Sequence, residues 1–158
     1  MANLDELLKP AVAEVFSTML KMDAKLVPSI EQELDQKTQV IGSIGLTGKV
    51  SAVVFLMMTE KLARTVTGNM LGLADHEIDG PELVNDAVGE LTNMIVGYTK
   101  TRLCDRGMNC AMTPPSVIRG TEMKVAGGSH SVTQKLSFQC QKSGITIQVI
   151  IRSDPEKM

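Results

Sequence analysis

The stretch VTQKLSFQCQKSGITIQVII, residues 132–151, carries the clearest pattern in the chain. Apolar side chains alternate with polar ones on either side of Ser143-Gly144, which is expected to turn the chain. They are Val132, Leu136, Phe138 and Cys140 before it and Ile145, Ile147, Val149 and Ile151 after it. Successive side chains of a strand point to opposite faces, so the alternation predicts a β-hairpin with one face on a core. The other face, with Thr146 and Gln148, is expected to be wetter, although Ile150 interrupts it.

A second hairpin is predicted nearer the N-terminus. Residues 49–58, KVSAVVFLMM, are nearly all apolar, which is typical of a strand buried on both faces. Residues 38–46 provide its partner, and Thr47-Gly48 predicts the tight turn between the two strands. The preceding residues 23–36 are polar and mixed, with a short extended piece expected around Leu26-Val27.

Helical periodicity is present in three segments, residues 3–22, 60–71 and 81–104. Thr59 can cap the second helix and Gly72 can end it. The start of the third is indicated by Asp79-Gly80-Pro81-Glu82, with a capping Asp, an early Pro and a Glu three residues on. Pro114-Pro115 then breaks the chain before an extended segment at 116–121 and a Gly-rich loop at 122–131.

The first and third helices match each other at a shift of 76 positions. Their apolar residues coincide, with Leu8, Ala11, Val12, Val15, Met19 and Met22 falling on Val84, Ala87, Val88, Leu91, Ile95 and Tyr98. Any two amphipathic helices share a period of about 3.6 residues, so chance also explains this match. The pairing of Glu14 with Glu90, and the common order of helix and then hairpin, favour an internal duplication. The predicted fold is α+β, with two helices across one largely antiparallel sheet.

Composition excludes several classes of function. A chain of 158 residues fits one domain with a hydrophobic core. A net charge of −2, with no Trp and one Tyr, argues against nucleic-acid binding. No apolar run approaches the roughly 20 residues that cross a bilayer, so membrane insertion is not expected.

The cysteines indicate the compartment. Cys104, Cys110 and Cys140 leave one thiol unpaired in any disulfide scheme, and the N-terminus has no secretory pattern, so a reducing cytoplasm is expected. No Cys-x2-Cys pair exists, so their spacing predicts small half-buried residues and no metal site.

The third helix also carries a polar stripe. Asp86, Glu90, Asn93 and Gly97 lie at positions i, i+4, i+7 and i+11, well away from the apolar arc. Any surface helix has a polar face, so simple solvation explains these side chains too. A helical Gly costs about 1 kcal/mol relative to Ala, and at position 97 it would let another backbone approach closely.

The pattern Asp86-x3-Glu90-x2-Asn93, followed by Pro115, resembles the signature of the CheC/CheX/FliY family of chemotaxis phosphatases. The run DAVGELTNMIVGYTKTRL, residues 86–103, is similar to the active helix of that family, and PPSVIRG, residues 114–120, resembles the strand that follows it. One intact motif with a degenerate first helix is most similar to the CheX branch. The resemblance implies a single CheX-like domain over 1–158, with a CheC-like two-layer arrangement.

The same resemblance implies a function. Members of the family dephosphorylate CheY-like response regulators, whose phosphorylated form holds the Mg²⁺; the phosphatase needs no cofactor of its own. By analogy Asn93 orients the attacking water and Glu90 pairs with a Lys of the regulator, while Asp86 and Gly97 contact the partner. The first helix, with Ser17 in place of Asn93, is then a scaffold. The resemblance also implies a homodimer through sheet edges.

An alternative of another class is a non-catalytic module that binds a response regulator or a flagellar-switch component. The same helical stripe would then serve only as a docking face.

Overall fold

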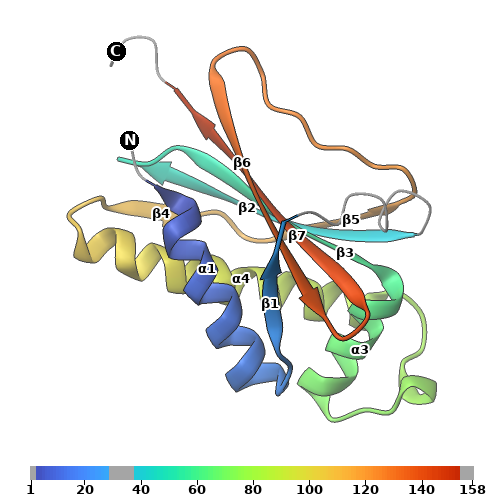
Figure 1. Ribbon diagram of the computed structural model, residues 1–158. Coiled ribbons are helices and arrows are strands. Elements are labelled where there is room, and N and C mark those ends of the chain that lie inside the picture. The colour runs from blue at the N-terminus through green and yellow to red at the C-terminus, as the bar shows by residue number, and fades with distance from the viewer. Residues whose placement is uncertain (1–2, 29–37, 154–158) are drawn as a thin grey trace.

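The computed structural model describes residues 3–28 and 38–153 (Figure 1). Its helical elements are α1 (Leu4–Val15), the π-helical turn η1 (Phe16–Leu20), α3 (Glu60–Leu71), the 3-10 turn η2 (Asp75–Glu77) and α4 (Glu82–Asp105). Its strands are β1 (Ala24–Val27), β2 (Gln39–Gly48), β3 (Ala52–Thr59), β4 (Cys110–Met112), β5 (Ser116–Gly120), β6 (Ser131–Cys140) and β7 (Ser143–Arg152). The extended piece predicted at Leu26-Val27 is β1; the rest of that polar segment, from residue 29, lies outside the described residues.

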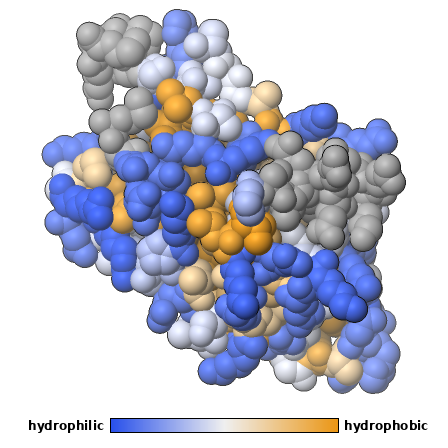
Figure 2. Space-filling model, in the orientation of Figure 1, coloured by the Kyte–Doolittle hydropathy of each residue, from blue (hydrophilic) through white to orange (hydrophobic). Residues whose placement is uncertain are grey.

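All seven strands belong to one antiparallel sheet. Their order is β1-β6-β7-β3-β2, and both β4 and β5 pair with the outer edge of β2. The helices α1, α3 and α4 lie together against one face of this sheet (Figure 1). Figure 2 shows hydrophilic side chains over most of the visible surface of the helices and apolar side chains toward the middle of the molecule. The predicted two-layer α+β fold is therefore confirmed.

The strand order shows the internal repeat. The pair β7–β3 lies at the centre, and each of these strands is flanked by its own hairpin partner, β6 or β2. Beyond each hairpin lies a strand from the other half of the chain: β1 beside β6, and β5 beside β2. The two halves thus exchange their first strands around a pseudo-twofold axis, with α1 packed against α4. This arrangement supports the duplication interpretation.

The core forms between the helices and the strand residues that face them. The predicted core face of the C-terminal hairpin is confirmed from Leu136 onward, with Ile145, Ile147 and Val149 fully buried, whereas Val132 is 39% exposed. The opposite face is not wet as predicted, because Thr146 and Gln148 are only 4% and 3% exposed. The Gln148 Nε2 donates to the carbonyl of Val125 at 2.6 Å, so the segment before β6 covers that face.

The first helix departs from regular α-helix near its end. A π-helical turn is wider than an α-helical turn, so it shifts the side chains that follow by about one position. Phe16 and Leu20 consequently face the core, whereas Met19 is 52% exposed. The predicted placement of Met19 on the core stripe is therefore wrong, and the repeat with α4 holds only as far as Val15.

Three predicted turns or ends also need correction. The C-terminal hairpin turns at residues 141–142 and not at Ser143-Gly144, which already belong to β7 and pair with β6. The strand β2 continues through Gly48, so the first turn lies at residues 49–51 and not at Thr47-Gly48. At the start of α4, Pro81 occupies the cap position with no side-chain cap, so Asp79 does not have its predicted role. The ends of α3 are confirmed, because the Thr59 hydroxyl accepts from the Leu62 amide and Gly72 has φ +69°.

The outer edge of β2 carries an irregular partner. Between β4 and β5, three residues (113–115) lie opposite two residues of β2, which is a β-bulge. Thr113 holds the bulge, since its amide donates to the Gly45 carbonyl at 2.9 Å and its hydroxyl accepts from the Gly45 amide at 2.8 Å. Proline has no N–H for the ladder, so Pro114-Pro115 suit an edge strand.

The sheet and α4 approach each other closely at Gly42 on β2. A Cβ built at Gly42 would collide with the hydroxyl of Thr92 and would lie 3.4 Å from Val88. Thr92 is buried, and its hydroxyl donates to the Val88 carbonyl at 2.7 Å. The missing side chain of Gly42 therefore sets how deeply α4 lies on the sheet.

We expect Gly42→Ala to lower the free energy of unfolding by about 1–3 kcal/mol, because the new methyl group overpacks the helix–sheet contact. Urea denaturation measures the change. Gly97→Ala is the matched control, since nothing lies within 4 Å of a Cβ there and the same substitution should raise stability. Adding Thr92→Ala should recover part of the loss, and an unchanged stability of Gly42→Ala would contradict the close contact.

Candidate functional site

The helix α4 separates an apolar arc from the polar stripe. Its buried residues include Val84, Ala87, Val88, Leu91 and Ile95. The stripe of Asp86, Glu90, Asn93 and Gly97 is centred about 150° away around the helix axis, at 3.6 residues per turn. Asp86 and Glu90 are exposed, and Asn93 and Gly97 are half-buried. The sequence prediction that these residues share a face remote from the core is confirmed.

The stripe has unused hydrogen-bonding capacity. Within residues 3–28 and 38–153, the side chains of Asp86, Glu90 and Asn93 make no hydrogen bond or ion pair. A carboxamide can both donate and accept, and a carboxylate can accept from a cation or from N–H groups. Two carboxylates and one carboxamide are thus presented to the outside without an internal partner.

Pro115 lies beside this stripe. A Cβ built at Gly89 would be 3.7 Å from the Cβ of Pro115 and 3.6 Å from Val117, at ordinary contact distance. Gly89 directly precedes Glu90 on α4, so the edge strand flanks the candidate site. Of the two adjacent prolines, Pro115 is the one that lies at this contact with α4.

The far end of the stripe is open. Nothing lies within 4 Å of a Cβ built at Gly97, so its lack of a side chain is not required by packing inside the chain. The next residue, Tyr98, is half-buried, and the guanidinium of Arg102 lies 3.4 Å from the centre of its ring. The sequence analysis missed this cation–π pair, although Tyr and Arg at i and i+4 are neighbours on a helix.

The corresponding surface of α1 lacks the same groups. Pro10 takes the place of Asp86, and Glu14 and Ser17 are exposed at the places of Glu90 and Asn93. Ser17 belongs to the π-helical turn, which alters its direction relative to Glu14. A serine hydroxyl also reaches less far than an asparagine carboxamide, which supports a scaffold role for α1.

The three cysteines are free thiols, half-buried at Cys104 and Cys110 and buried at Cys140, as expected from the sequence. Burial, with a smaller contribution from Cys104, raises the pKa of the Cys110 thiol. Burial likewise raises the pKa of Cys140. Both thiols are therefore protonated near neutral pH and are poor nucleophiles. No group of three or more metal-binding side chains occurs among the described residues.

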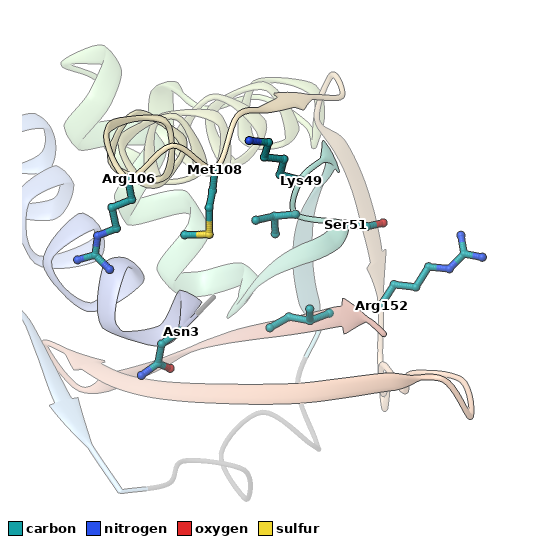
Figure 3. A pocket seen from close by; sticks show the side chains of 8 residues that line it. Asn3, Lys49, Ser51, Arg106, Met108 and Arg152 are labelled. Carbon is teal, nitrogen blue, oxygen red and sulfur yellow. The ribbon is translucent and has the colours of Figure 1, made fainter. Parts of the chain in front are cut away.

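A hollow of about 550 Å³ lies near the C-terminal end of α4, away from the stripe. Its cationic side chains diverge (Figure 3): Arg152 points outward, and the Lys49 ammonium donates to the Gly107 carbonyl at 3.3 Å. Arg106 also points away from both. The hollow thus offers no converging set of charges for a small anion. The stripe itself runs along an outward-facing side of α4 on which Asp86 and Glu90 are exposed.

Three known proteins illustrate the similarity. The CheY-P phosphatase CheX of Thermotoga maritima is 27% identical over 117 residues, 73% of this chain and 74% of that protein. The crystal structure of the chemotaxis protein CheX from Vibrio vulnificus has a TM-score of 0.82 at 25% identity, covering 96% of this chain and 97% of that one. The CheX–CheY–BeF3–Mg²⁺ complex from Borrelia burgdorferi has a TM-score of 0.79 at 23% identity, covering 97% and 100%.

None of the helices in the described parts of the chain has the length and apolar content needed to cross a membrane.

The family model for chemotaxis phosphatase CheX matches residues 40–137, more than half of the chain and the whole of the polar stripe. The chain therefore belongs to the CheX family of chemotaxis phosphatases.

Proposed function

We propose that this protein accelerates hydrolysis of the aspartyl-phosphate on a CheY-like response regulator, with Asn93 and Glu90 of α4 as its catalytic residues. One observation carries the proposal: Asn93 and Glu90 are neighbours on an outward-facing helix surface and have no partner among the described residues. Family membership supplies the reaction, and the exposed position of the stripe on α4 makes it accessible to a phosphorylated protein.

The reaction demands little chemistry from the phosphatase. An acyl phosphate is intrinsically labile, so positioning a water in line with the phosphorus provides most of the acceleration. The water oxygen forms a bond to phosphorus while the bond from phosphorus to the aspartyl oxygen breaks, which regenerates the carboxylate and releases inorganic phosphate. The Mg²⁺ belongs to the phosphorylated regulator, in line with the Borrelia burgdorferi complex that contains CheY, BeF3 and Mg²⁺.

Asn93 is suited to the position next to the phosphate. Its carboxamide oxygen can accept a hydrogen bond from the attacking water while its amide NH2 group donates to a phosphoryl oxygen. The group is uncharged, so the phosphate does not repel it. A carboxylate at the same position would be repelled by the phosphoryl oxygens.

Glu90 is better suited to a cation on the partner. Its carboxylate is one turn from Asp86 and is exposed, so it can pair with a lysine of the regulator as the helix docks. Asp86 adds a second negative charge on the same side. Gly97 would let the partner backbone approach α4 closely at the other end of the stripe.

Asn93→Ala should lower the rate of phosphate release from a phosphorylated CheY-type regulator by on the order of 100-fold, equivalent to about 3 kcal/mol. Binding to the beryllofluoride-activated regulator should persist, because Asn93 acts mainly in the transition state. Ser17→Ala, at the corresponding place on α1, is the matched control and should leave the rate unchanged. If the wild-type protein binds the regulator without accelerating phosphate release, the non-catalytic docking module is the correct function.

Glu90→Gln should act on docking, because it removes the charge that pairs with the lysine and keeps the shape. We expect a several-fold rise in KM, with the effect reduced at high salt as for other exposed ion pairs. Gly97→Leu should also raise KM, by steric blocking that salt does not alter. Steady-state phosphate release at several ionic strengths measures both, and a KM unaffected by Glu90→Gln would exclude the pairing role.

We further propose that the protein forms a homodimer through its sheet edges. Among the described residues, the outer edges of β1 and of β4–β5 have no strand partner, and Leu26 and Ile118 on these strands are each 52% exposed. Light scattering at micromolar concentration should give twice the chain mass of 17.1 kDa. Ile118→Lys, which places a charge on the exposed edge strand, should lower the dimer fraction if β5 forms the interface; a monomeric wild-type protein would refute the proposal. We also propose a cytoplasmic location, because free thiols persist in a reducing compartment.

A further inference from the structure

The side chain of Arg119 joins three elements at the start of α4. Arg119 lies on β5, and its Nε donates to the Asn85 Oδ1 at 2.6 Å. Its Nη1 is 3.4 Å from the Glu60 Oε1 at the first residue of α3. The side chain is 20% exposed, so most of this contact is shielded from water. One guanidinium therefore ties the edge strand to the N-terminal turns of two helices.

These contacts lie next to the proposed catalytic stripe. Alternate residues of the edge strand face α4: Pro115 and Val117 lie against Gly89, and Arg119 binds Asn85 one turn earlier. Asn85 and Gly89 occupy the side of α4 between its sheet contact at Thr92 and the stripe. Any rotation of α4 about its axis would break this line of contacts and swing the stripe with it.

Stability alone explains Arg119 poorly. Its Nη2 is buried and has no hydrogen-bond partner among the described residues. A buried donor left without an acceptor costs free energy, and an apolar side chain of similar size would avoid that cost. The guanidinium of arginine is planar and its N–H donors point in fixed directions, whereas the ammonium group of lysine has no such fixed arrangement. The geometry favours a role in orientation.

We propose that Arg119 is a positioning residue, which acts through Asn85 to set the rotation of α4 and hence the direction of Glu90 and Asn93. The inference rests on the proposed function for its effect on turnover, but its effect on α4 is independent of that function. Arg119 does not touch the phosphate in this scheme. Its guanidinium is tied inside the chain, to Asn85 and Glu60.

The test compares Arg119→Met, Asn85→Ala and the double variant with the wild type. We expect each to lower kcat by about tenfold or more, since a small misplacement of catalytic groups has effects of this size. KM should change less than twofold, and the double variant should be no slower than the slower single variant, because both act through one contact. Arg64→Met is the matched control; among the described residues, Arg64 bonds to Asp75 and Ile78 and makes no hydrogen bond or ion pair with α4.

A second readout does not depend on catalysis. Amide hydrogen exchange over residues 85–93 should become about tenfold faster in Arg119→Met and Asn85→Ala, while the urea midpoint stays near that of the wild type. Arg119→Lys provides a variant that keeps the charge, in case Arg119→Met fails to fold. Arg119→Lys should still lower kcat, because lysine lacks the planar set of N–H donors that binds Asn85 and Glu60 together.

The outcomes separate the two proposals. Wild-type kcat and wild-type exchange in either Arg119→Met or Arg119→Lys would overturn the positioning role. Equal losses in Arg64→Met would also overturn it, since the effect would then be general. If the wild-type protein does not accelerate phosphate release at all, the proposed function fails, and faster exchange in α4 would still support Arg119 as the residue that holds this helix.

Discussion

The burial of one face of α4 on β2 is the constraint on which the rest of the structure depends. Gly42 has no side chain, so Thr92 and Val88 approach the strand closely. The Thr92 hydroxyl donates back to the Val88 carbonyl, so this polar group is satisfied inside the core. Leu91 and Ile95 are nearly fully buried, and each such side chain contributes about 1.5–3 kcal/mol. Turning α4 would expose these residues, so the core itself directs the stripe outward.

The edge strand adds a second support on the other side of α4. The bulge at residues 113–115 places prolines where the ladder needs no N–H, and Pro115 then packs against Gly89. Arg119 continues this line to Asn85. Apolar burial thus holds one side of α4. The contact of Pro115 with Gly89 and the hydrogen bond of Arg119 with Asn85 hold the adjacent side. Only the remaining side, which carries Glu90 and Asn93, is left to a partner.

Local patterns in the sequence were enough to predict the main elements. The hairpin over residues 132–151, the cap at Thr59 and the end at Gly72 depend on near neighbours along the chain, and the structure confirms all three. The two faces of α4 were also predictable, because helical periodicity alone separates them. The stripe became a candidate site only through resemblance, since a solvated polar face has the same pattern.

The features that escaped prediction depend on contacts between distant residues or on rare local geometry. Met19 turns outward because a π-helical turn interrupts the period. Gln148 is buried because the segment around Val125, 23 residues earlier, covers it and accepts its hydrogen bond. The alternation of residues within a strand does not indicate which distant segment will cover its outer face. The strand β4 has three residues, too few for a periodic signal. Arg119 and Asn85 are 34 residues apart, so their bond could not be read from spacing.

The internal repeat explains why one half of the molecule can carry the site while both halves are needed for the fold. The helix α1 covers part of the sheet beside α4, so it retains a buried face with Leu8 and Val12. The outer face of the first helical segment does not have to be buried. Pro10 and Ser17 stand there at the positions that correspond to Asp86 and Asn93. In the proposed reaction the phosphorylated partner brings the labile bond and the metal. For that reaction, a carboxamide and a carboxylate held on one rigid helix are enough. The sheet and the edge strand provide the contacts that hold this helix in place.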